Sequence, residues 1–234
     1  MDFIKKILDI LYPKRCCFCG EISHAEKCPD CAKKVIYIKE PRCKKCGRPV
    51  RYDEQEYCYE CQKQSHFYIQ GKSIWLHKNP VNTSIYQFKY HNRRIFGEYY
   101  AHEMYRLFKK DITSWKIDVI IPVPLHKKRR RKRGYNQAEI IAKELGKISE
   151  IPVDCRFVYR KKSTKAQKEL DAKERRCNLT DAFEVVDMRY KGKNILLIDD
   201  IYTTGSTIDT VAETILIKMK CNIWFLTISI GQDF

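Results

Sequence analysis

Eight of the twelve cysteines occur as four pairs, and in each pair two residues separate the two cysteines. This spacing lets both thiolates of a pair face one metal ion, and two such pairs supply the four sulfur ligands of a closed structural zinc site. Disulfides are not expected, because the N-terminal residues lack the pattern of an export signal and thiols inside cells stay reduced. The sequence therefore predicts two structural Zn²⁺ sites, with the ligands Cys16, Cys19, Cys28, Cys31, Cys43, Cys46, Cys58 and Cys61.

The order of the cysteine pairs permits two arrangements of the ligands. Residues 16–31 and residues 43–61 look like two copies of one zinc ribbon, and this repetition favours a shared ion for neighbouring pairs. In the alternative, cross-braced arrangement, the first pair shares an ion with the third and the second with the fourth. In either case four thiolates close each site, so we expect zinc to stabilise a small module and to take no part in catalysis.

A second group of chemically active side chains follows a continuous apolar run at residues 195–198. Two carboxylates suit sugar hydroxyls or Mg²⁺, whereas hydroxyls and backbone amides at the start of a helix suit a phosphate group. An ordinary helix cap is the plain alternative. Because both halves occur together after a predicted buried strand, the segment predicts a site for a ligand with a sugar and a phosphate. Its residues are Asp199, Asp200, Thr203, Thr204, Gly205, Ser206 and Thr207.

The elements that must position these side chains alternate between strands and helices after residue 71. Hydrophobic patterning predicts strands at residues 117–123, 153–159, 183–186, 195–198 and 223–230, and helices at residues 94–108, 135–145 and 208–219. The alternation predicts an α/β fold with a parallel sheet, in which ligands bind at the carboxyl ends of the strands. We expect an N-terminal module at residues 1–66, with a docking helix at residues 3–11, and a larger domain at residues 67–234.

The chain is strongly basic, because 46 lysines and arginines face 29 acidic residues and leave a net charge of +17. Two segments, residues 127–133 and 156–176, carry most of the surplus and are predicted to be loops. They indicate an anionic partner, either a polyphosphate metabolite or nucleic acid, with a solvated surface as the alternative. The first segment consists of Lys127, Lys128, Arg129, Arg130, Arg131, Lys132 and Arg133. No apolar stretch reaches the roughly 18 residues of a membrane span, so we expect a cytoplasmic protein.

Four segments together resemble the ComF family of competence proteins. They are the cysteine pairs, residues 121–138, residues 160–178 and residues 199–207. The resemblance covers nearly the whole chain. It implies a parallel sheet like that of type I phosphoribosyltransferases, preceded by a double zinc ribbon module. It also implies that the ligand is phosphoribosyl pyrophosphate (PRPP), bound with Mg²⁺.

The same resemblance implies a role for each matching position. Asp199 and Asp200 would contact the ribose hydroxyls, residues 203–207 the 5′-phosphate, and the loop that opens at Pro124 and Leu125 the pyrophosphate. Residues 160–178 would form a mobile loop that closes over the ligand. Further candidates for binding PRPP are Arg133, Lys161 and Arg175, and the candidates for catalysis are Asp199, Asp200 and Arg160.

Three functions are compatible with these features. The first is phosphoribosyl transfer from PRPP to an acceptor that the sequence does not identify. The second is binding of single-stranded DNA during its uptake in natural transformation, which the resemblance implies. The basic run and aromatic rings would bind the DNA, although the spacing of the rings also suits a core; they include Phe88, Tyr90, Tyr99 and Tyr100. The third is an adaptor that recruits a DNA-uptake helicase or a membrane pore component at the inner face of the membrane.

Overall fold

The computed structural model describes residues 14–161 and 182–231. The docking helix expected at residues 3–11 lies outside the described residues. Most of the expected mobile loop at residues 160–178 also lies outside them, including Arg175. Within the two described ranges, no helix is both long enough and apolar enough to cross a membrane.

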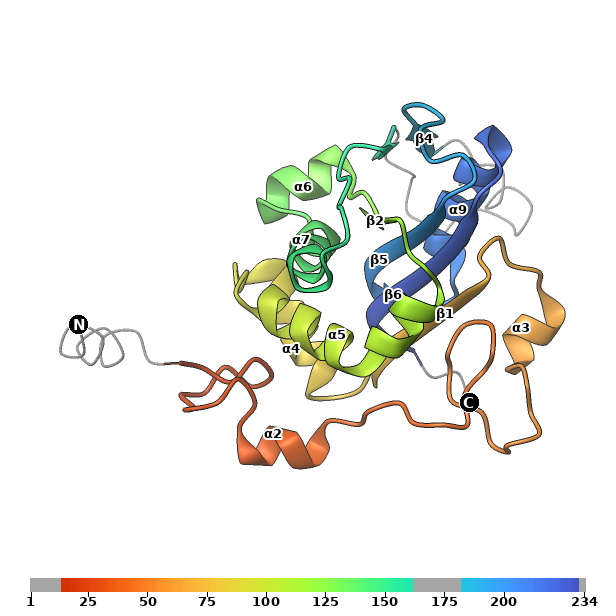
Figure 1. Ribbon diagram of the computed structural model, residues 1–234. Coiled ribbons are helices and arrows are strands. Elements are labelled where there is room, and N and C mark those ends of the chain that lie inside the picture. Colours follow the sequence, from red (N-terminus) through yellow and green to blue (C-terminus); the bar gives the residue numbers. More distant parts are fainter. Residues whose placement is uncertain (1–13, 162–181, 232–234) are drawn as a thin grey trace, which may run out of the picture.

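Four parallel strands form the main sheet, in the order β1, β6, β5 and β2 (Figure 1). Their bounds are Gln70–Leu76 for β1, Val119–Pro122 for β2, Asn194–Tyr202 for β5 and Asn222–Ile230 for β6. The register aligns Ile195 of β5 with Val119 of β2 on one side and with Ile223 of β6 on the other. A strand that is paired on both sides and covered on both faces needs a continuous apolar sequence, as β5 has. The predicted parallel α/β fold is therefore confirmed.

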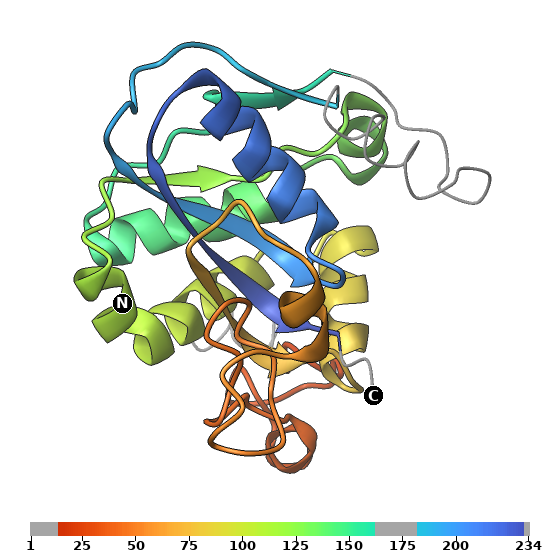
Figure 2. The same cartoon turned by 90° about the vertical axis from the view of Figure 1, so that its right-hand side faces the viewer.

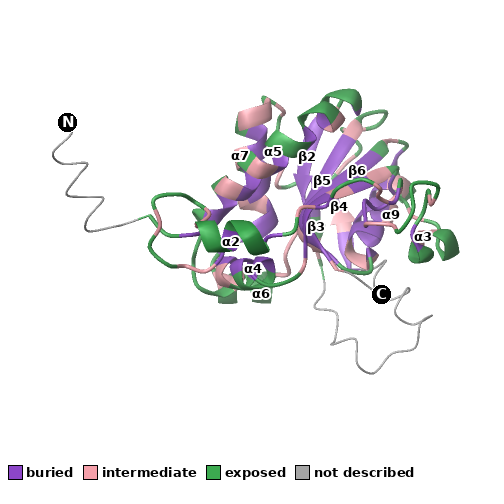
Figure 3. Cartoon of the chain, turned by 90° about the horizontal axis from the view of Figure 1, so that it is seen from below, coloured by how far each residue is buried: buried purple, intermediate pink, exposed green. Residues whose placement is uncertain are grey.

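Helices cover both faces of this sheet (Figure 3). Their bounds are Val81–Tyr90 for α4, Phe96–Ser114 for α5, Gln137–Ser149 for α7 and Ser206–Lys218 for α9. Leu196 and Ile198 of β5 belong to the core that contains α5 and α7, whereas Ile195 and Leu197 belong to the core that contains α9. Helices α7 and α9 follow the neighbouring strands β2 and β5 but lie on opposite faces. A ligand-binding crevice is therefore expected at the carboxyl ends of β2 and β5.

The basic run differs from its prediction, because Lys127–Arg133 forms the helix α6 and not a loop. The His126 side chain caps the start of α6 by accepting a hydrogen bond from the amide of Lys128 at 3.2 Å. Gly134 ends the helix with a left-handed φ of 79°. Lysine and arginine form helices readily, and cations in a last turn are favoured by the helix dipole. The two end signals therefore outweigh the mutual repulsion of the seven charges.

Two of the predicted strand segments form an antiparallel pair apart from the main sheet. These strands are β3 at Val158–Arg160 and β4 at Phe183–Val185. Strand β3 is shorter than predicted, and Val153 makes only an isolated bridge with Ile120 of β2. The pair places Arg160 at the end of β3, close to residue 161, where the first described range ends.

The two zinc ribbons lie beside β1, at one edge of the sheet (Figure 2). The first ribbon (residues 16–31) leads into helix α2 at Pro29–Lys34, and the second ribbon (residues 43–61) into helix α3 at Tyr59–Lys63. The chain between them pairs with β1, because the amide of Leu76 donates to the carbonyl of Ile36 and the amide of Ile38 to the carbonyl of Ile74, both at 3.1 Å. This pairing covers the edge of the sheet and joins the ribbons to it.

Candidate functional site

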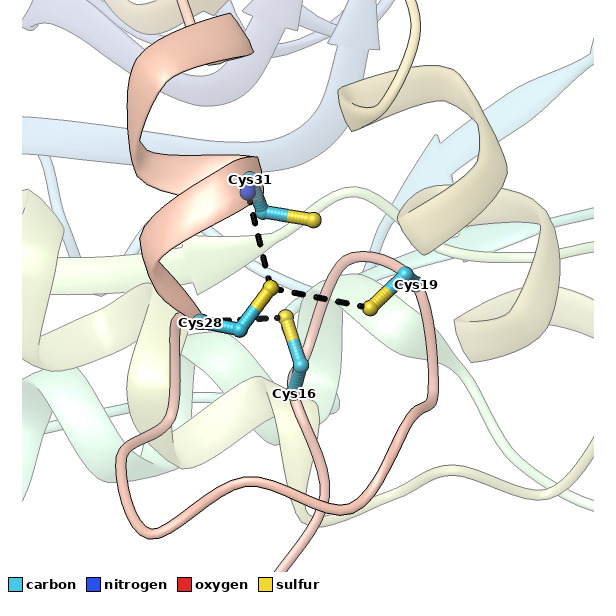
Figure 4. A group of neighbouring side chains, drawn as sticks. All are labelled: Cys16, Cys19, Cys28 and Cys31. Carbon is cyan, nitrogen blue, oxygen red and sulfur yellow. Dashed lines mark hydrogen bonds between the residues drawn. The ribbon is translucent and has the colours of Figure 1, made fainter.

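The first cysteine cluster has the geometry of a zinc site. The side chains of Cys16, Cys19, Cys28 and Cys31 converge, with all sulfur atoms within 4.8 Å of one another (Figure 4). The sulfurs of Cys19 and Cys28 are 3.8 Å apart, which is about the separation that tetrahedral Zn–S bonds of ~2.3 Å require. The amides of Phe18 and Cys28 each lie 3.4 Å from the sulfur of Cys16, so they stabilise a thiolate there. The residues present therefore fit Zn²⁺.

The second cluster repeats this arrangement with Cys43, Cys46, Cys58 and Cys61. The sulfurs of Cys46 and Cys58 are 3.6 Å apart. In both clusters the third cysteine occupies the N-cap position of a short helix, Cys28 before α2 and Cys58 before α3, and the sulfur of Cys28 also accepts a hydrogen bond from the amide of Cys31. The sequential pairing of ligands is confirmed, and the cross-braced alternative is wrong. Four thiolates would close each site, so a bound Zn²⁺ would crosslink the ribbon.

The candidate phosphate loop (residues 203–207) connects β5 directly to the start of α9. Thr203 and Thr204 are exposed, and the hydroxyl of Thr204 lies 3.2 Å from that of Ser206. Gly205 has a left-handed φ of 79°, and a Cβ atom at this position would lie 2.3 Å from the hydroxyl oxygen of Tyr202. The glycine is therefore required by both backbone conformation and space. The loop offers hydroxyls and amides at a helix N-terminus, as phosphate binding requires.

The two acidic residues lie at the end of β5, beside this loop. The side chain of Asp199 accepts a hydrogen bond from the amide of Asp200 at 2.8 Å. Burial, and after it the charge of Asp200, raises the pKa of Asp199 to about 7. Lys89 of α4 forms an ion pair with Asp200 at 2.7 Å, and both side chains are mostly buried. An additional cation near Asp199 would favour its ionised form, so the pair is suited to a metal-bound ligand.

Arg160 approaches the acidic pair from β3. Burial, followed by the charge of Arg129, lowers the pKa of Arg160, and the charge of Asp199 opposes this shift. The guanidinium of Arg160 also lies over the ring of Phe183, 5.1 Å from its centre. Pro124 and Leu125 are half-buried directly after β2, where the amide of Val123 still bonds to the carbonyl of Ile198. The structure thus brings the predicted residues of β2, β3 and β5 together at one end of the sheet.

Other predicted residues have different partners. Lys161 forms an ion pair with Glu184, and Arg133 donates hydrogen bonds to Gln137 at 3.0 Å and to the hydroxyl of Tyr90 at 3.1 Å. Lys89 was missed by sequence reasoning, because helix α4 was not predicted and a single lysine carries no signal of its own. The acidic residue that Lys89 pairs with lies 111 positions later in the sequence.

The basic helix α6 has an aromatic neighbour. It contains no buried residue, and the guanidinium of Arg133 lies 4.9 Å from the ring centre of Tyr90. The ring of Tyr90 is in turn 4.9 Å from that of Tyr86, and both rings are exposed. Of the other predicted stacking rings, Phe88 and Tyr100 are fully buried and Tyr99 is partly buried. These three belong to the core, as their helical spacing allowed.

Two protein families match successive parts of the chain. Residues 7–62 match the family described as "Double zinc ribbon domain", and residues 91–228 match the family described as "Phosphoribosyl transferase domain". The first match contains all eight zinc ligands. The second contains α6, the acidic pair and the phosphate loop.

Named relatives are similar to parts of this chain. Competence protein F of Haemophilus influenzae is 32% identical over 139 residues, which are 57% of this chain and 61% of that protein. Competence protein ComFC of Bacillus subtilis is 31% identical over 158 residues, 64% of this chain and 60% of that protein. DNA utilization protein YhgH of Escherichia coli K12 is 33% identical over 99 residues, 42% of this chain and 43% of that protein. The resemblance to the ComF family is confirmed, although the chain spans less than two thirds of each of these relatives.

Proposed function

Because this chain belongs to the phosphoribosyl transferase domain family and has a double zinc ribbon ahead of that domain, we propose that it binds PRPP with Mg²⁺ at the carboxyl end of β5. One observation carries the proposal. Strand β5 presents two neighbouring carboxylates near its end, and an exposed hydroxyl-rich loop then connects it to the N-terminus of α9. The proposed sugar site and phosphate site are therefore neighbours at the carboxyl end of β5, and this fold favours ligands at the carboxyl ends of its strands.

Each part of PRPP has a place in this proposal. The phosphate loop binds the 5′-phosphate, because its amides and hydroxyls donate and the helix N-terminus favours negative charge. Asp199 and Asp200 accept hydrogen bonds from the ribose hydroxyls. Arg160 and the backbone at residues 124–125 face the pyrophosphate. When bound, Mg²⁺ supplies positive charge to the pyrophosphate oxygens.

The reaction that this arrangement supports is phosphoribosyl transfer. The bond between C1 of the ribose and pyrophosphate breaks, and pyrophosphate leaves with the electron pair. A nucleophilic acceptor forms the new bond to C1 and gives up a proton. The carboxylates of Asp199 and Asp200 stabilise the positive charge that develops on the sugar, and the guanidinium of Arg160 stabilises the leaving group.

Calorimetric titration of the zinc-loaded protein with PRPP, with and without Mg²⁺, tests the proposal. We expect Mg²⁺-dependent binding that the double variant Asp199→Asn/Asp200→Asn loses. The matched control is Glu21→Gln/Asp30→Asn, which removes two exposed carboxylates from the first ribbon and its helix. It should bind as the wild type does. No binding by the wild-type protein would contradict the proposal and leave the fold as a scaffold.

The surface formed by α6 and the outer side of α4 supports a second function, which is binding of single-stranded DNA. Exposed cations follow the backbone of a single strand, and exposed aromatic rings stack on its bases. Here Tyr86 and Tyr90 supply neighbouring exposed rings, and Arg133 joins them to the basic helix. The names of the relatives refer to competence and to DNA utilization. We therefore infer that this surface binds single-stranded DNA during DNA uptake.

The salt dependence of DNA binding tests this second function. Replacement of Lys127, Lys128, Arg131 and Lys132 by glutamine should lower the slope of log K against log salt by up to about 3, since each contact with single-stranded DNA contributes about 0.7. The control replaces four exposed lysines elsewhere, Lys33, Lys34, Lys110 and Lys191. An equal loss of slope in both proteins would mean that α6 is not the binding surface.

A further inference from the structure

The second ribbon contacts the phosphate loop directly. Arg48 donates a hydrogen bond from Nη2 to the backbone carbonyl of Thr203 at 2.8 Å, across a separation of 155 residues in the sequence. The Arg48 side chain is anchored at its base, because its own carbonyl accepts a hydrogen bond from the amide of the zinc ligand Cys43 at 2.7 Å. Arg48 is only 6% exposed. A buried cation of the second ribbon therefore binds the backbone of the loop.

A second contact runs from the chain just after the second ribbon to the first turn of α9. Both carboxylate oxygens of Asp209 are bonded: Oδ2 lies 2.6 Å from Nδ1 of His66, and Oδ1 accepts from the amide of Phe67 at 3.1 Å. The other ring nitrogen of His66 lies 3.4 Å from the sulfur of the zinc ligand Cys61. His66 thus connects a zinc ligand to helix α9, which begins within the phosphate loop.

A third contact fixes the residue that precedes the loop. The hydroxyls of Tyr68 and Tyr202 are 2.7 Å apart, and both side chains are buried. The ring of Tyr202 is stacked on Phe225 with 4.9 Å between ring centres. The hydroxyl of Tyr202 occupies the space that a side chain at position 205 would need. The chain that follows the second ribbon therefore also sets the position of the tyrosine beneath Gly205.

From these three contacts we propose that the second zinc ribbon positions the phosphate loop, with Arg48 as its principal positioning residue. Thr203 and Thr204 are exposed and belong to neither β5 nor α9. A loop of this kind binds more tightly when other groups restrict its conformations before the ligand arrives. The inference rests on the proposed PRPP site, because it names what orders that site.

Amide hydrogen exchange in residues 199–210 of the full-length, zinc-loaded protein tests the proposal, together with zinc content and PRPP titration. Arg48→Gln removes the contact to Thr203, and Arg48→Lys keeps the charge without the guanidinium fork. The ring of His66 is stacked on that of Tyr68, so His66→Phe keeps a ring there and removes both nitrogens. The matched control is Arg15→Gln, because Arg15 directly precedes the first ribbon and donates to the carbonyl of Gly20 at 3.0 Å.

We expect Arg48→Gln to keep two zinc ions, to exchange the loop amides about tenfold faster and to bind PRPP about tenfold more weakly. Arg48→Lys should be intermediate and Arg15→Gln unchanged. If Arg48→Gln loses zinc, the test is His66→Phe, in which faster hydrogen exchange of the loop amides would support the proposal. Unchanged exchange in both Arg48→Gln and His66→Phe would overturn it. If the wild type does not bind PRPP but Arg48→Gln still loosens the loop, the PRPP site is wrong and the positioning role stands.

Discussion

Both zinc ribbons have four cysteine ligands, the third of which precedes a short helix, yet they pack against different parts of the molecule. The first ribbon contacts α4 and β1: the hydroxyl of Ser84 bonds to the carbonyl of Cys17, and Phe18 lies edge-on to Trp75 with 5.3 Å between ring centres. The second ribbon contacts the start of β1 and, through Arg48, the phosphate loop. Duplicated metal sites in one chain can therefore have separate structural roles.

Among the described residues, the first ribbon is linked to the acidic pair through helix α4. Ser84 and Lys89 both belong to α4, and Lys89 pairs with Asp200 at the sugar end of the candidate site. The second ribbon needs no intermediate at the phosphate end. We infer that the elements each ribbon contacts, and not its zinc ligands, decide how strongly its zinc affects the site.

Removal of the last ligand from each zinc site should give the largest contrast. Cys31→Ser and Cys61→Ser occupy equivalent positions, so each should lower the zinc content from two ions to one. Because metal binding and folding of a ribbon are coupled, the loss should unfold that ribbon locally. We expect PRPP affinity to fall by about a hundredfold in Cys61→Ser and by less than about threefold in Cys31→Ser. Equal losses of PRPP affinity in the two variants would contradict the different roles that we assign to the two ribbons.

A pair of glycine variants examines the phosphate loop itself. Gly205→Ala and Gly192→Ala impose similar backbone strain, since the φ angles are 79° and 73°. A Cβ atom would meet the hydroxyl of Tyr202 at position 205, but it would meet nothing within 4 Å at position 192. Both variants should lose about 1–2 kcal/mol of stability from strain. Only Gly205→Ala should displace Tyr202 from Tyr68 and weaken PRPP binding by about tenfold or more, as measured by titration.

Loss of affinity in Gly192→Ala as large as that in Gly205→Ala would show that general strain, and not the contact with Tyr202, disturbs the site.

The pH dependence of stability separates the sugar end of the site from the ribbons. The pKa of Asp199 is raised to about 7 in the folded protein, above the value of about 4 for an unfolded chain. The contribution of its uncharged form to stability is therefore complete below about pH 4 and is lost as the pH rises through 7. Asp199→Asn should melt at a higher temperature than the wild type at pH 8, with a gain that shrinks toward pH 5. Asp53→Asn, at an exposed site, is the control.

A gain in Asp199→Asn that does not change between pH 5 and pH 8 would mean that the ionisation of Asp199 is not the cause.

The smallest effect on PRPP affinity is expected where the first ribbon meets α4. Ser84→Ala removes the hydroxyl that contacts the carbonyl of Cys17 and the hydroxyl of Tyr100. The loss of buried hydrogen bonds should cost about 1–3 kcal/mol and lower the melting temperature by several degrees. PRPP affinity should not change. A change in affinity without a change in melting temperature would give the first ribbon the direct influence that we assign to the second.

Local spacing explains what could be predicted from the sequence. The four cysteine pairs indicated both zinc sites and their sequential order, because ligands close in the sequence close each site. The apolar run before Asp199 and the glycine at 205 indicated a strand, a loop and a helix in succession, which are β5, the phosphate loop and α9. In each case neighbouring residues contain the whole signal.

The remaining features depend on contacts between distant residues. Strand β1 and helix α4 have weak patterns of their own and are fixed by packing against β6 and the first ribbon. Arg48 is one of 46 basic residues, and nothing near it in the sequence indicates that it reaches Thr203. The helix α6 was missed because a run of like charges is usually solvated, whereas its two end residues decide its structure.

A crystal structure of the zinc-loaded protein with PRPP and Mg²⁺ would test the central claim most directly. We expect the 5′-phosphate to lie on the amides of residues 203–207, with Arg48 still bonded to the carbonyl of Thr203 and the ribose beside Asp199 and Asp200. A phosphate bound elsewhere, or a loop that binds phosphate after Arg48 has left Thr203, would contradict it.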